Sequence, residues 1–283
     1  MRYGLPYKGS KNSIARWIVD NLPPAEWFLD LFCGGGAVTH AALISGKYKQ
    51  FIMNDIDGRL PVFFKNCIDG KYTVENHPEW VTRASFNMWK TIDAYTALIW
   101  SFGNNGKDYL YGQEIEGFKK DYHSAIYDGA VYRLNNYGYN ITESDDPRPY
   151  ERYLSYQRQI KEQNPKLINL ENLSRQNEIE RLQSLQGLQS LQGLQSLQGL
   201  QSLQGSYSDA KIPDNALIYC DIPYANTNCG KYQGFDHETF YKWARNQDNI
   251  YISEYWMPED FIEVANIEKS VLSAADGNGY KNT

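Results

Sequence analysis

Residues 219–224, Tyr-Cys-Asp-Ile-Pro-Tyr, hold the groups that methylation of an aromatic amine requires. The exocyclic nitrogen of adenine is a weak nucleophile because its lone pair is delocalised into the ring. Two acceptors for its N–H groups, the Asp221 carboxylate and the Ile222 carbonyl, would raise that nucleophilicity, and Pro223 restricts the chain beside them. Tyr224 can stack on a base turned out of a duplex. Taken alone, the segment also fits an ordinary strand end followed by a turn.

A glycine turn near the start of the chain predicts a site for a nucleotide-like cofactor. An apolar run leads into residues 30–36, Asp-Leu-Phe-Cys-Gly-Gly-Gly, which puts small residues where a backbone must approach a ligand closely. The dinucleotide pattern G-x-G-x-x-G is met at Gly34 and Gly36, but Thr39 holds its third position, which disfavours a pyrophosphate grip. Asp55 follows about 20 residues later, where a carboxylate can accept both hydroxyls of a ribose. A tight turn without a ligand and an exposed loop aspartate are the alternatives.

Short apolar runs separated by helical patterns position these residues on a predicted parallel sheet. Runs at 27–32 and 51–55 flank a helix predicted over 37–44, which is typical of the opening of a doubly wound α/β fold. Strand patterns return at 216–220 and 249–253, after a long interval without them. We therefore expect the catalytic domain to be assembled from both ends of the chain.

Two further helices are predicted beside these strands. One runs through Ile14, Ile18 and Leu22 after a cap at Asn12 or Ser13. The other covers residues 237–245, directly after the segment that contains Asp221.

The middle of the chain predicts an inserted domain followed by a linker. Beyond residue 62 apolar residues become sparse, and helices are expected within 79–100 and 150–179. Residues 182–205 are four copies of Leu-Gln-Ser-Leu-Gln-Gly, whose leucine spacing fits neither the helical nor the strand period. We interpret this repeat as a flexible low-complexity spacer, helical at most in its first turns, with a small solenoid or self-association element as the alternative. The predicted parts are 1–62 and 210–283 for the catalytic domain, 63–181 for the insert and 182–209 for the linker.

Composition narrows the class of protein. The formal net charge of −6 argues mildly against a nucleic-acid partner, although a local basic groove can coexist with an acidic remainder. No apolar run approaches the roughly 20 residues of a membrane span, and the first residues lack a signal-peptide pattern, so we expect a cytoplasmic protein that does not contact membranes. The cysteines lie far apart and favour free thiols over a zinc site or disulfides, so no metal is expected. They are Cys33, Cys67, Cys220 and Cys229.

Four segments, in this order, resemble the Dam-type (D12 class) DNA adenine-N6 methyltransferases. They are Tyr7-Lys8-Gly9-Ser10-Lys11, Asp30-Leu31-Phe32-Cys33-Gly34-Gly35-Gly36, Asn54-Asp55 and Asp221-Ile222-Pro223-Tyr224. The resemblance covers about half the chain, at its two ends. It implies an α/β, Rossmann-like S-adenosylmethionine methyltransferase fold in which 63–181 is a mainly helical target-recognition domain. The implied activity is methylation of adenine N6 in a specific DNA sequence, by base flipping and direct methyl transfer.

The resemblance also assigns site residues. It implies that S-adenosylmethionine is bound by Tyr7, Lys11, Asp30, Gly34, Gly36, Asp55 and Asp221. The catalytic residues would be Asp221, Ile222, Pro223 and Tyr224, and the target base would contact Tyr224 and Phe235. Ile222 stands where the family usually has proline, but the family uses the backbone carbonyl there, so the chemistry is expected to survive with one restraint fewer. His237 is interpreted as a helix-start residue, because the amine proton becomes acidic once the methyl group arrives.

The implied partner is double-stranded DNA, with a restriction endonuclease as a possible second partner in restriction-modification, and a monomer or weak dimer is expected. Lys107, Lys119, Lys120 and Arg133 are candidates for phosphate contacts, but acidic residues interleave with them, so a mixed solvated surface is the alternative. An N4-cytosine, RNA or other amine methyltransferase is one alternative function. A weakly active DNA-binding relic of the family is another.

Overall fold

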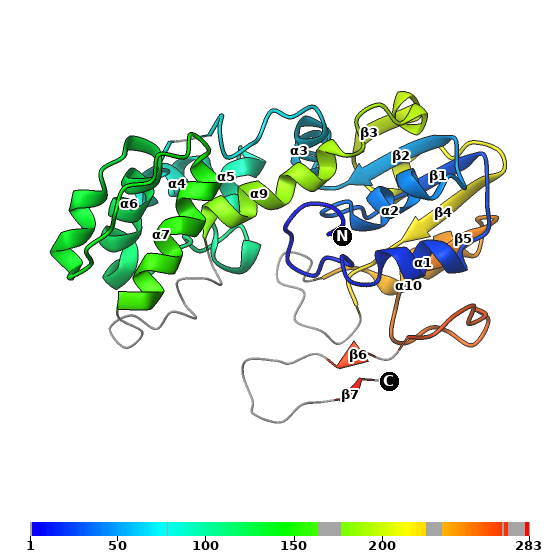
Figure 1. Ribbon diagram of the computed structural model, residues 1–283. Coiled ribbons are helices and arrows are strands. Elements are labelled where there is room, and N and C mark those ends of the chain that lie inside the picture. The colour runs from blue at the N-terminus through cyan, green and yellow to red at the C-terminus, as the bar shows by residue number, and fades with distance from the viewer. Residues whose placement is uncertain are drawn as a thin grey trace.

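A computed structural model of the chain describes residues 2–77, 79–163, 177–224, 234–267, 269–270 and 281–282. It shows a sheet covered by helices, and a helical region that extends to one side of the sheet (Figure 1). The sheet strands are β1 (Trp27–Asp30), β2 (Gln50–Asp55), β3 (Leu200–Gln204), β4 (Ala216–Cys220) and β5 (Ile250–Ile252). The helices are α1 (Ala15–Asn21), α2 (Ala37–Ser45), α3 (Arg59–Ile68), α4 (Arg83–Trp89), α5 (Ala94–Ile99), α6 (Gln113–Asp128), α7 (Pro149–Gln163), α9 (Glu178–Gln189) and α10 (His237–Ala244). Two short strands, β6 (Lys269–Ser270) and β7 (Lys281–Asn282), pair with each other.

The central sheet is parallel, with strand order β3-β2-β1-β4-β5. Its inner strands are apolar throughout because both faces are covered, and every residue of β4 is buried. Asp30 ends β1 and is paired with Met53 on one side and Tyr219 on the other. Asp55 ends β2, and Asp221 follows β4 directly, so three carboxylates gather at the carboxyl edge of the sheet. This arrangement agrees with the predicted Rossmann-like fold.

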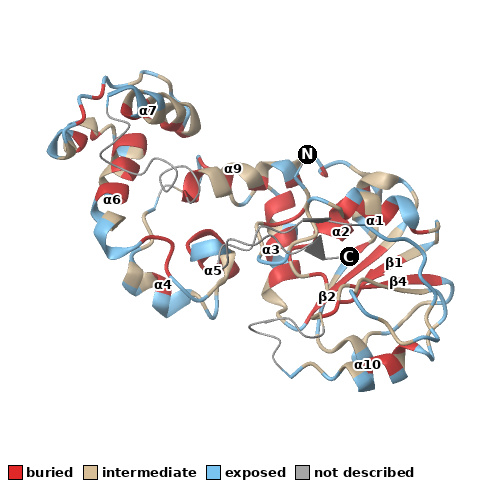
Figure 2. Cartoon of the chain, turned by 90° about the horizontal axis from the view of Figure 1, so that it is seen from below, coloured by how far each residue is buried: buried red, intermediate tan, exposed pale blue. Residues whose placement is uncertain are grey.

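Alternate residues of each strand enter two separate cores. Phe28 and Phe51 pack on the face that carries α1, α2 and α3, whereas Leu29 and Ile52 pack on the face that carries α10. Figure 2 shows this burial as red segments along β1, β2 and β4. The same alternation fixes the strand register, because a slip of one residue would exchange the two faces.

The helical region contains α4 to α7 and is joined to the sheet region by α9 (Figure 1). Its core is aromatic, with Trp100, Tyr153 and Tyr156 fully buried. Helices were expected within 79–100 and 150–179, and α4, α5 and α7 confirm them for the described residues. Residues 164–176 of the second range lie outside the described part of the chain.

The prediction of a flexible spacer at 182–209 is wrong for the Leu-Gln repeat. Its first copies form most of α9, residues 195–199 form a 3₁₀ helix, and the last copy forms β3 in the catalytic sheet. Leucines at every third residue step about 60° around a helix, which predicts no single apolar face. Here α9 packs against α3, α5 and α7, so leucines on more than one side are covered. The buried leucines of the repeat are Leu182, Leu185, Leu188, Leu191 and Leu200.

The structure corrects the predicted cap of α1 and qualifies the burial of the last sheet strand. Neither Asn12 nor Ser13 caps α1, which begins after Ile14, and the Asn12 side chain instead accepts a hydrogen bond from the Tyr3 amide at 3.1 Å. Strand β5 is only half-buried, because it is an edge strand.

Among the described cysteines, Cys33, Cys67 and Cys220 are free and buried as expected, and Cys229 lies outside the described residues. Of the described helices, none has the length and hydrophobicity of a membrane-spanning segment.

Candidate active site

A cavity of about 910 Å³ lies at the carboxyl ends of β1, β2 and β4. Its walls combine the start of the chain, the glycine turn, the strand ends and part of the helical region. Of the residues predicted for the site, those that line the cavity are Tyr7, Lys11, Asp30, Gly34, Asp55, Asp221, Ile222, Pro223, Tyr224 and Phe235. Segments more than 200 residues apart in the sequence, such as Tyr7 and Asp221, therefore share one site.

The glycine turn forms one wall because Tyr7 packs directly on it. A Cβ atom on Gly35 would lie 2.7 Å from the Tyr7 Cβ, and one on Gly34 would lie 3.2 Å from the ring. Gly34 also has a φ of 48°, which side chains rarely adopt. The Leu5 amide donates to the Gly35 carbonyl at 2.7 Å and fixes the start of the chain over the turn. Glycine is thus needed here for a close approach of two backbone segments.

Gly36, which was predicted to bind the cofactor, packs closely against core side chains. It is absent from the lining of the cavity, and a Cβ atom there would lie 2.8 Å from both the Met53 and the Phe64 side chains. With a φ of 68°, it precedes the first residue of α2. Core packing beneath the turn therefore already requires glycine at position 36.

Asp55 ties the end of β2 to the glycine turn. Its Oδ2 accepts from the Gly34 amide at 2.8 Å, and its Oδ1 accepts from the Asp57 amide at 2.9 Å. The carboxylate is buried at the cavity wall, with 4% of the residue exposed. Each carboxylate oxygen can accept a second hydrogen bond, so both remain suitable for ligand hydroxyls.

Asp30 is a buried carboxyl group with one oxygen left unbonded. Its Oδ2 accepts from the Thr39 hydroxyl at 2.7 Å, whereas its Oδ1 has no hydrogen-bond partner among the described residues. Burial raises the pKa of Asp30 to about 7, and the negative charges of Asp221 and Asp55 add to this effect. A cation or N–H donor bound in the cavity would relieve that cost.

Asp221 forms an ion pair with Lys11. The Lys11 ammonium lies 2.7 Å from Asp221 Oδ1 and 4.4 Å from the centre of the Tyr224 ring. Burial raises the pKa of Asp221, and the ammonium group opposes that rise. Lys11 therefore helps to keep the carboxylate ionised and orients it beside the aromatic ring.

The backbone after Asp221 is held from two sides. The Ile222 side chain is 2% exposed and packs in the core beneath α10. The Pro223 carbonyl accepts from His237 Nε2 at 2.7 Å. His237 begins α10 after the Asp236 cap, as predicted, and this contact supplies a restraint beside the position where proline was expected. The Ile222 carbonyl accepts no backbone hydrogen bond from the described residues.

Aromatic rings surround residues 221–224, which were predicted to be catalytic. Tyr224 meets Tyr255 edge to face at 4.6 Å, and Phe235 meets Phe32 edge to face at 5.7 Å. Tyr207 stacks on Phe32 at 5.4 Å and also lines the cavity. Sequence reasoning missed Tyr207 because it follows the repeat, which was interpreted as a spacer.

A second group of residues that was not predicted for this cavity comes from the helical region. Asn104, Asn105 and Asp108 line the same cavity as Asp221, together with Lys107, which was predicted only as a phosphate contact. The composition of this loop predicts a turn, and Gly103, Asn104 and Gly106 indeed have positive φ angles. No local pattern could show that the turn faces the catalytic loop, because that depends on how the insert is attached.

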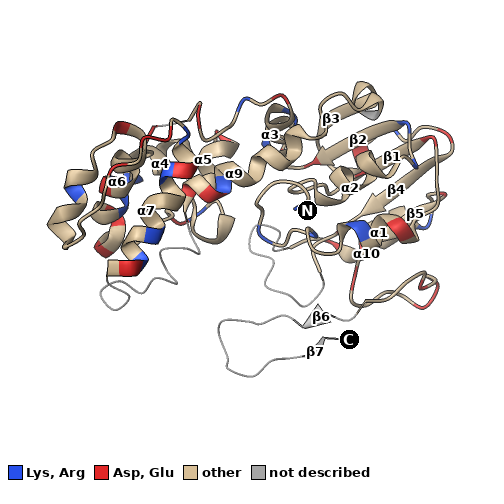
Figure 3. Cartoon of the chain, viewed as in Figure 1, with Lys and Arg blue, Asp and Glu red and all other residues tan. Residues whose placement is uncertain are grey.

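The predicted phosphate contacts are only partly available. Lys119 is 2% exposed, so its prediction as a surface contact is wrong. Arg133 lies 3.4 Å from Asp121 in an ion pair. Figure 3 shows acidic and basic residues interspersed over α4 to α7, in agreement with the mixed-surface alternative. No cluster of three or more His, Cys, Asp or Glu suited to a metal ion occurs in the described part of the chain.

Comparison with known families gives one match. A model of the D12 class N6 adenine-specific DNA methyltransferases matches residues 7–188. The matched range includes Tyr7, the glycine turn and Asp55, and it extends into α9. The catalytic loop at Asp221 lies beyond the matched range. No curated protein sequence matches the chain.

Proposed function

Because this chain belongs to the D12 class of N6 adenine-specific DNA methyltransferases, we propose that it methylates adenine in a specific sequence of double-stranded DNA, using S-adenosylmethionine. The observation that carries the proposal is the shared cavity, where Asp30, Asp55 and Asp221 meet at neighbouring strand ends. Its volume of about 910 Å³ is near the top of the usual range of ~300–1,000 Å³ for small-molecule sites. A cofactor and an extruded nucleoside can therefore share it.

The cofactor half of the cavity fits S-adenosylmethionine, which supplies a methyl group on a positively charged sulfur. The unbonded Oδ1 of Asp30 suits the ammonium of the methionine part, and Asp55 suits the ribose hydroxyls. Gly34 and Gly35 line the cavity beside Tyr7, and without side chains there a ligand can approach the backbone closely. Negative charge at this edge of the sheet also favours a cationic ligand.

Asp221 and the Ile222 carbonyl are the acceptors we assign to the adenine amine. Two hydrogen bonds accepted from its N–H groups localise the nitrogen lone pair and raise its nucleophilicity. Lys11 keeps Asp221 ionised, so the carboxylate is a good acceptor without being a strong base. A strong base is not required because the amine proton becomes acidic on methylation.

The target base must leave the duplex to reach Asp221, which follows a buried strand. Tyr224, supported by Tyr255, is the ring we assign to stack on the flipped adenine, and Phe235 forms a second apolar wall. Lys8 and Lys107 lie at the same cavity and can neutralise nearby phosphates. A restriction endonuclease partner, a monomeric or weakly dimeric state and a cytoplasmic location remain predictions from the sequence, as do the boundaries 63–181 of the recognition insert.

The proposal is tested by incubating the protein with tritiated S-adenosylmethionine and DNA, then digesting the DNA to nucleosides. Label is expected in N6-methyl-2′-deoxyadenosine. Label in N4-methyl-2′-deoxycytidine, or label in RNA but not DNA when each is offered in a separate incubation, would support the other amine substrates, and no label with intact DNA binding would support the inactive relic.

Asp221→Asn tests the catalytic assignment, with the exposed Asp248→Asn as its matched control. Asparagine keeps the shape of the side chain but removes the charge paired with Lys11 and one acceptor. The transfer rate should fall by about 100-fold or more, as for loss of a preorganised polar group in an active site, and Asp248→Asn should match wild type. Undiminished transfer in Asp221→Asn would show that the site is misassigned.

A further inference from the structure

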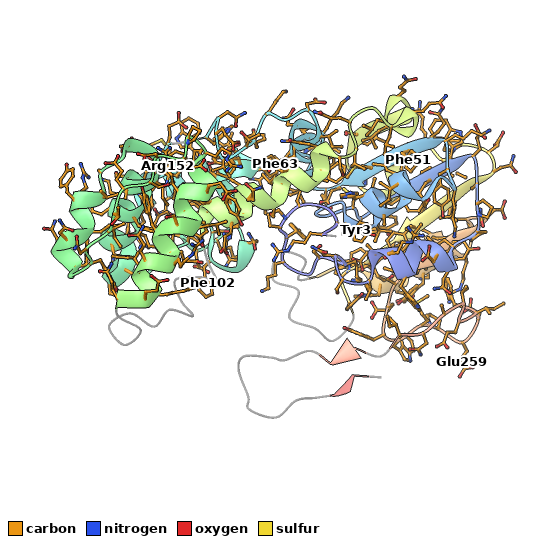
Figure 4. The ribbon with its side chains drawn as sticks, viewed as in Figure 1. Tyr3, Phe51, Phe63, Phe102, Arg152 and Glu259 are labelled. Carbon is orange, nitrogen blue, oxygen red and sulfur yellow. The ribbon has the colours of Figure 1, made fainter. Side chains whose placement is uncertain are left out.

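The loop between α5 and α6, residues 100–112, is the part of the helical region that reaches the cavity. We call it the cavity loop. Its residues Asn104, Asn105, Lys107 and Asp108 line the same cavity as Asp221. Phe102, which precedes these residues, is 53% exposed and lies at the lower edge of the helical region in Figure 4. The cavity loop therefore contributes several polar groups to the wall of the cavity.

Hydrogen bonds within the cavity loop give it a hairpin-like shape. The Phe102 amide donates to the Asp108 carbonyl, and the Leu110 amide donates to the Trp100 carbonyl, each at 2.8 Å. The Gly106 amide donates to the Ser101 hydroxyl at 3.0 Å. These bonds fix the shape of the loop, but they do not fix its direction relative to the sheet. That direction depends on what holds its two ends.

The start of the cavity loop is held by Arg181, in the first turns of α9. One guanidinium nitrogen lies within hydrogen-bond distance of three backbone carbonyls, and it donates to Ile99 at 2.7 Å and to Ser101 at 2.6 Å. The third carbonyl, of Leu98, is at 3.3 Å. Carbonyls at a helix C-terminus lack partners within the helix, so Arg181 caps α5 from outside. Burial lowers the pKa of Arg181 to about 10, which leaves it charged at neutral pH.

The end of the cavity loop is held by Glu178, one turn earlier on α9. The Tyr111 hydroxyl and His123 Nδ1 both donate to its carboxylate, the second at 2.9 Å. Glu178 is 2% exposed, and Trp80 stacks on the Tyr111 ring at 5.6 Å. A buried carboxylate with these donors is costly to move, because any displacement would leave its charge without compensation.

The far end of α9 leads into the catalytic sheet. After α9 the chain passes through the 3₁₀ helix Gln195–Gly199 into β3, which pairs with β2 in register, Gln204 opposite Asp55. One continuous segment therefore links both ends of the cavity loop to the strand that carries Asp55. Figure 1 shows α9 spanning the space between the helical region and the sheet.

We propose that Arg181 and Glu178 are positioning residues that fix the cavity loop in the wall of the active-site cavity, where it contacts the DNA substrate. The kinetic consequences of this proposal rest on the proposed methyltransferase function. Loosening the loop should impair use of DNA, because the loop shares the cavity with Asp221 and Tyr224, and should leave cofactor binding intact, because Asp30, Asp55 and Tyr7 are untouched.

The test compares Arg181→Gln with Arg148→Gln, a control at a residue whose side chain is 63% exposed and paired with Asp146 at the surface. Hydrogen exchange of the amides in residues 101–110 should accelerate at least about 10-fold in Arg181→Gln and stay at the wild-type rate in Arg148→Gln. In methylation assays the KM for DNA should rise by about 10-fold, with the Kd for S-adenosylmethionine unchanged within roughly 2-fold. Arg181→Lys should give intermediate values, because lysine keeps the positive charge but not the length and planar geometry of the guanidinium group.

Each arm has an outcome that overturns the proposal. Equal exchange in Arg181→Gln and Arg148→Gln would refute the clamp, whether or not the protein methylates DNA. Accelerated exchange with an unaltered KM for DNA, in an active enzyme, would refute the link to substrate.

If Arg181→Gln does not fold, Tyr111→Phe tests the proposal instead, because it removes only the hydroxyl bound to Glu178. Unchanged exchange of residues 101–110 in that variant would contradict the clamp. A wild-type protein that transfers no methyl group would refute the proposed function and leave the exchange arm to decide the clamp.

Discussion

The first and fourth copies of the repeat have the same six residues and different structures. Residues 182–187 lie within α9, whereas residues 200–204 of the last copy form β3. The second leucine of each copy shows the difference most clearly, because Leu185 is fully buried and Leu203 is 37% exposed. The first leucines, Leu182 and Leu200, are buried in both.

The difference teaches that the neighbours of each copy select its conformation. For Leu, Gln and Ser, the intrinsic free energies of the helical and the extended conformation differ little. A modest contribution from tertiary packing therefore decides between helix and strand. The first copy is part of α9, which packs against α3, α5 and α7, so that leucines on several sides of the helix are covered. The fourth lies along β2, which would otherwise expose unpaired backbone groups at the sheet edge.

The glycines that end the copies differ in the same way. Gly187 lies inside α9, Gly193 has a φ of 83°, and Gly199 approaches Gln50 and Lys49 at the sheet edge. Identical residues therefore meet a helix interior, a left-handed turn and a close backbone contact. Each of these environments predicts a different response to the same substitution.

The largest effect is expected from truncating the second leucine. Leu185→Ala should lower the free energy of unfolding by about 3–4 kcal/mol, because it leaves a cavity among α3, α5 and α7, whereas Leu203→Ala should cost under about 1 kcal/mol. Urea unfolding followed by circular dichroism measures both. Equal losses would mean that the two copies are equally packed and would break the comparison.

The second prediction is that the contribution of Asp30 to the free energy of unfolding depends on pH, whereas the contribution of the repeat does not. Asp30 has its pKa raised from 3.8 to about 7, so at intermediate pH the native state binds a proton that the unfolded chain has lost. Raising the pH removes that proton, and the free energy of unfolding should fall by roughly 2–3 kcal/mol from this group between pH 5 and 8. Asp30→Asn should flatten that dependence.

The repeat has no titratable side chain, so Leu185→Ala should lower the free energy of unfolding by the same amount at pH 5 and at pH 8. A loss that changes with pH would contradict the assignment of the pH dependence to Asp30.

A third prediction concerns the close contact at the sheet edge. In Gly199→Ala, the new Cβ would lie 2.9 Å from the Lys49 carbonyl and closer still to the Gln50 side chain. We expect a loss of about 1–2 kcal/mol, because the backbone contact can relax only by moving β3 away from β2. Thermal unfolding detects the change, and a variant as stable as wild type would place the third copy away from the sheet.

The smallest effects should have opposite signs at two glycines of the helical copies. Gly187→Ala should stabilise by about 0.5 kcal/mol, since its nearest neighbour is the Arg2 carbonyl at 3.9 Å and alanine favours the helix. Gly193→Ala should destabilise by about 1 kcal/mol, because its positive φ strains any L side chain. Midpoints of urea unfolding resolve the pair. The same sign at both positions would show that α9 extends further into the second copy or ends earlier.

Most of the catalytic half could be predicted from the sequence, because its signals are local. Continuous apolar runs identify strands that are buried on both faces, and the glycine turn with Asp55 marks the carboxyl edge of the sheet. The pairing of Lys11 with Asp221 could not be predicted, since it joins residues 210 positions apart in the chain. The same holds for Tyr207 and the cavity loop, whose positions depend on how distant segments dock.

The sequence by itself determined the order of the motifs, the buried strands and the positions where only glycine fits, because burial and backbone geometry impose patterns on neighbouring residues. The tertiary structure alone decided which copy of Leu-Gln-Ser-Leu-Gln-Gly became helix and which became strand. It also decided that Arg181 and Glu178 hold the cavity loop beside the catalytic site. The six residues are identical in every copy, so they cannot determine by themselves which copy forms helix and which forms strand. The surfaces that surround each copy in the folded protein determine it.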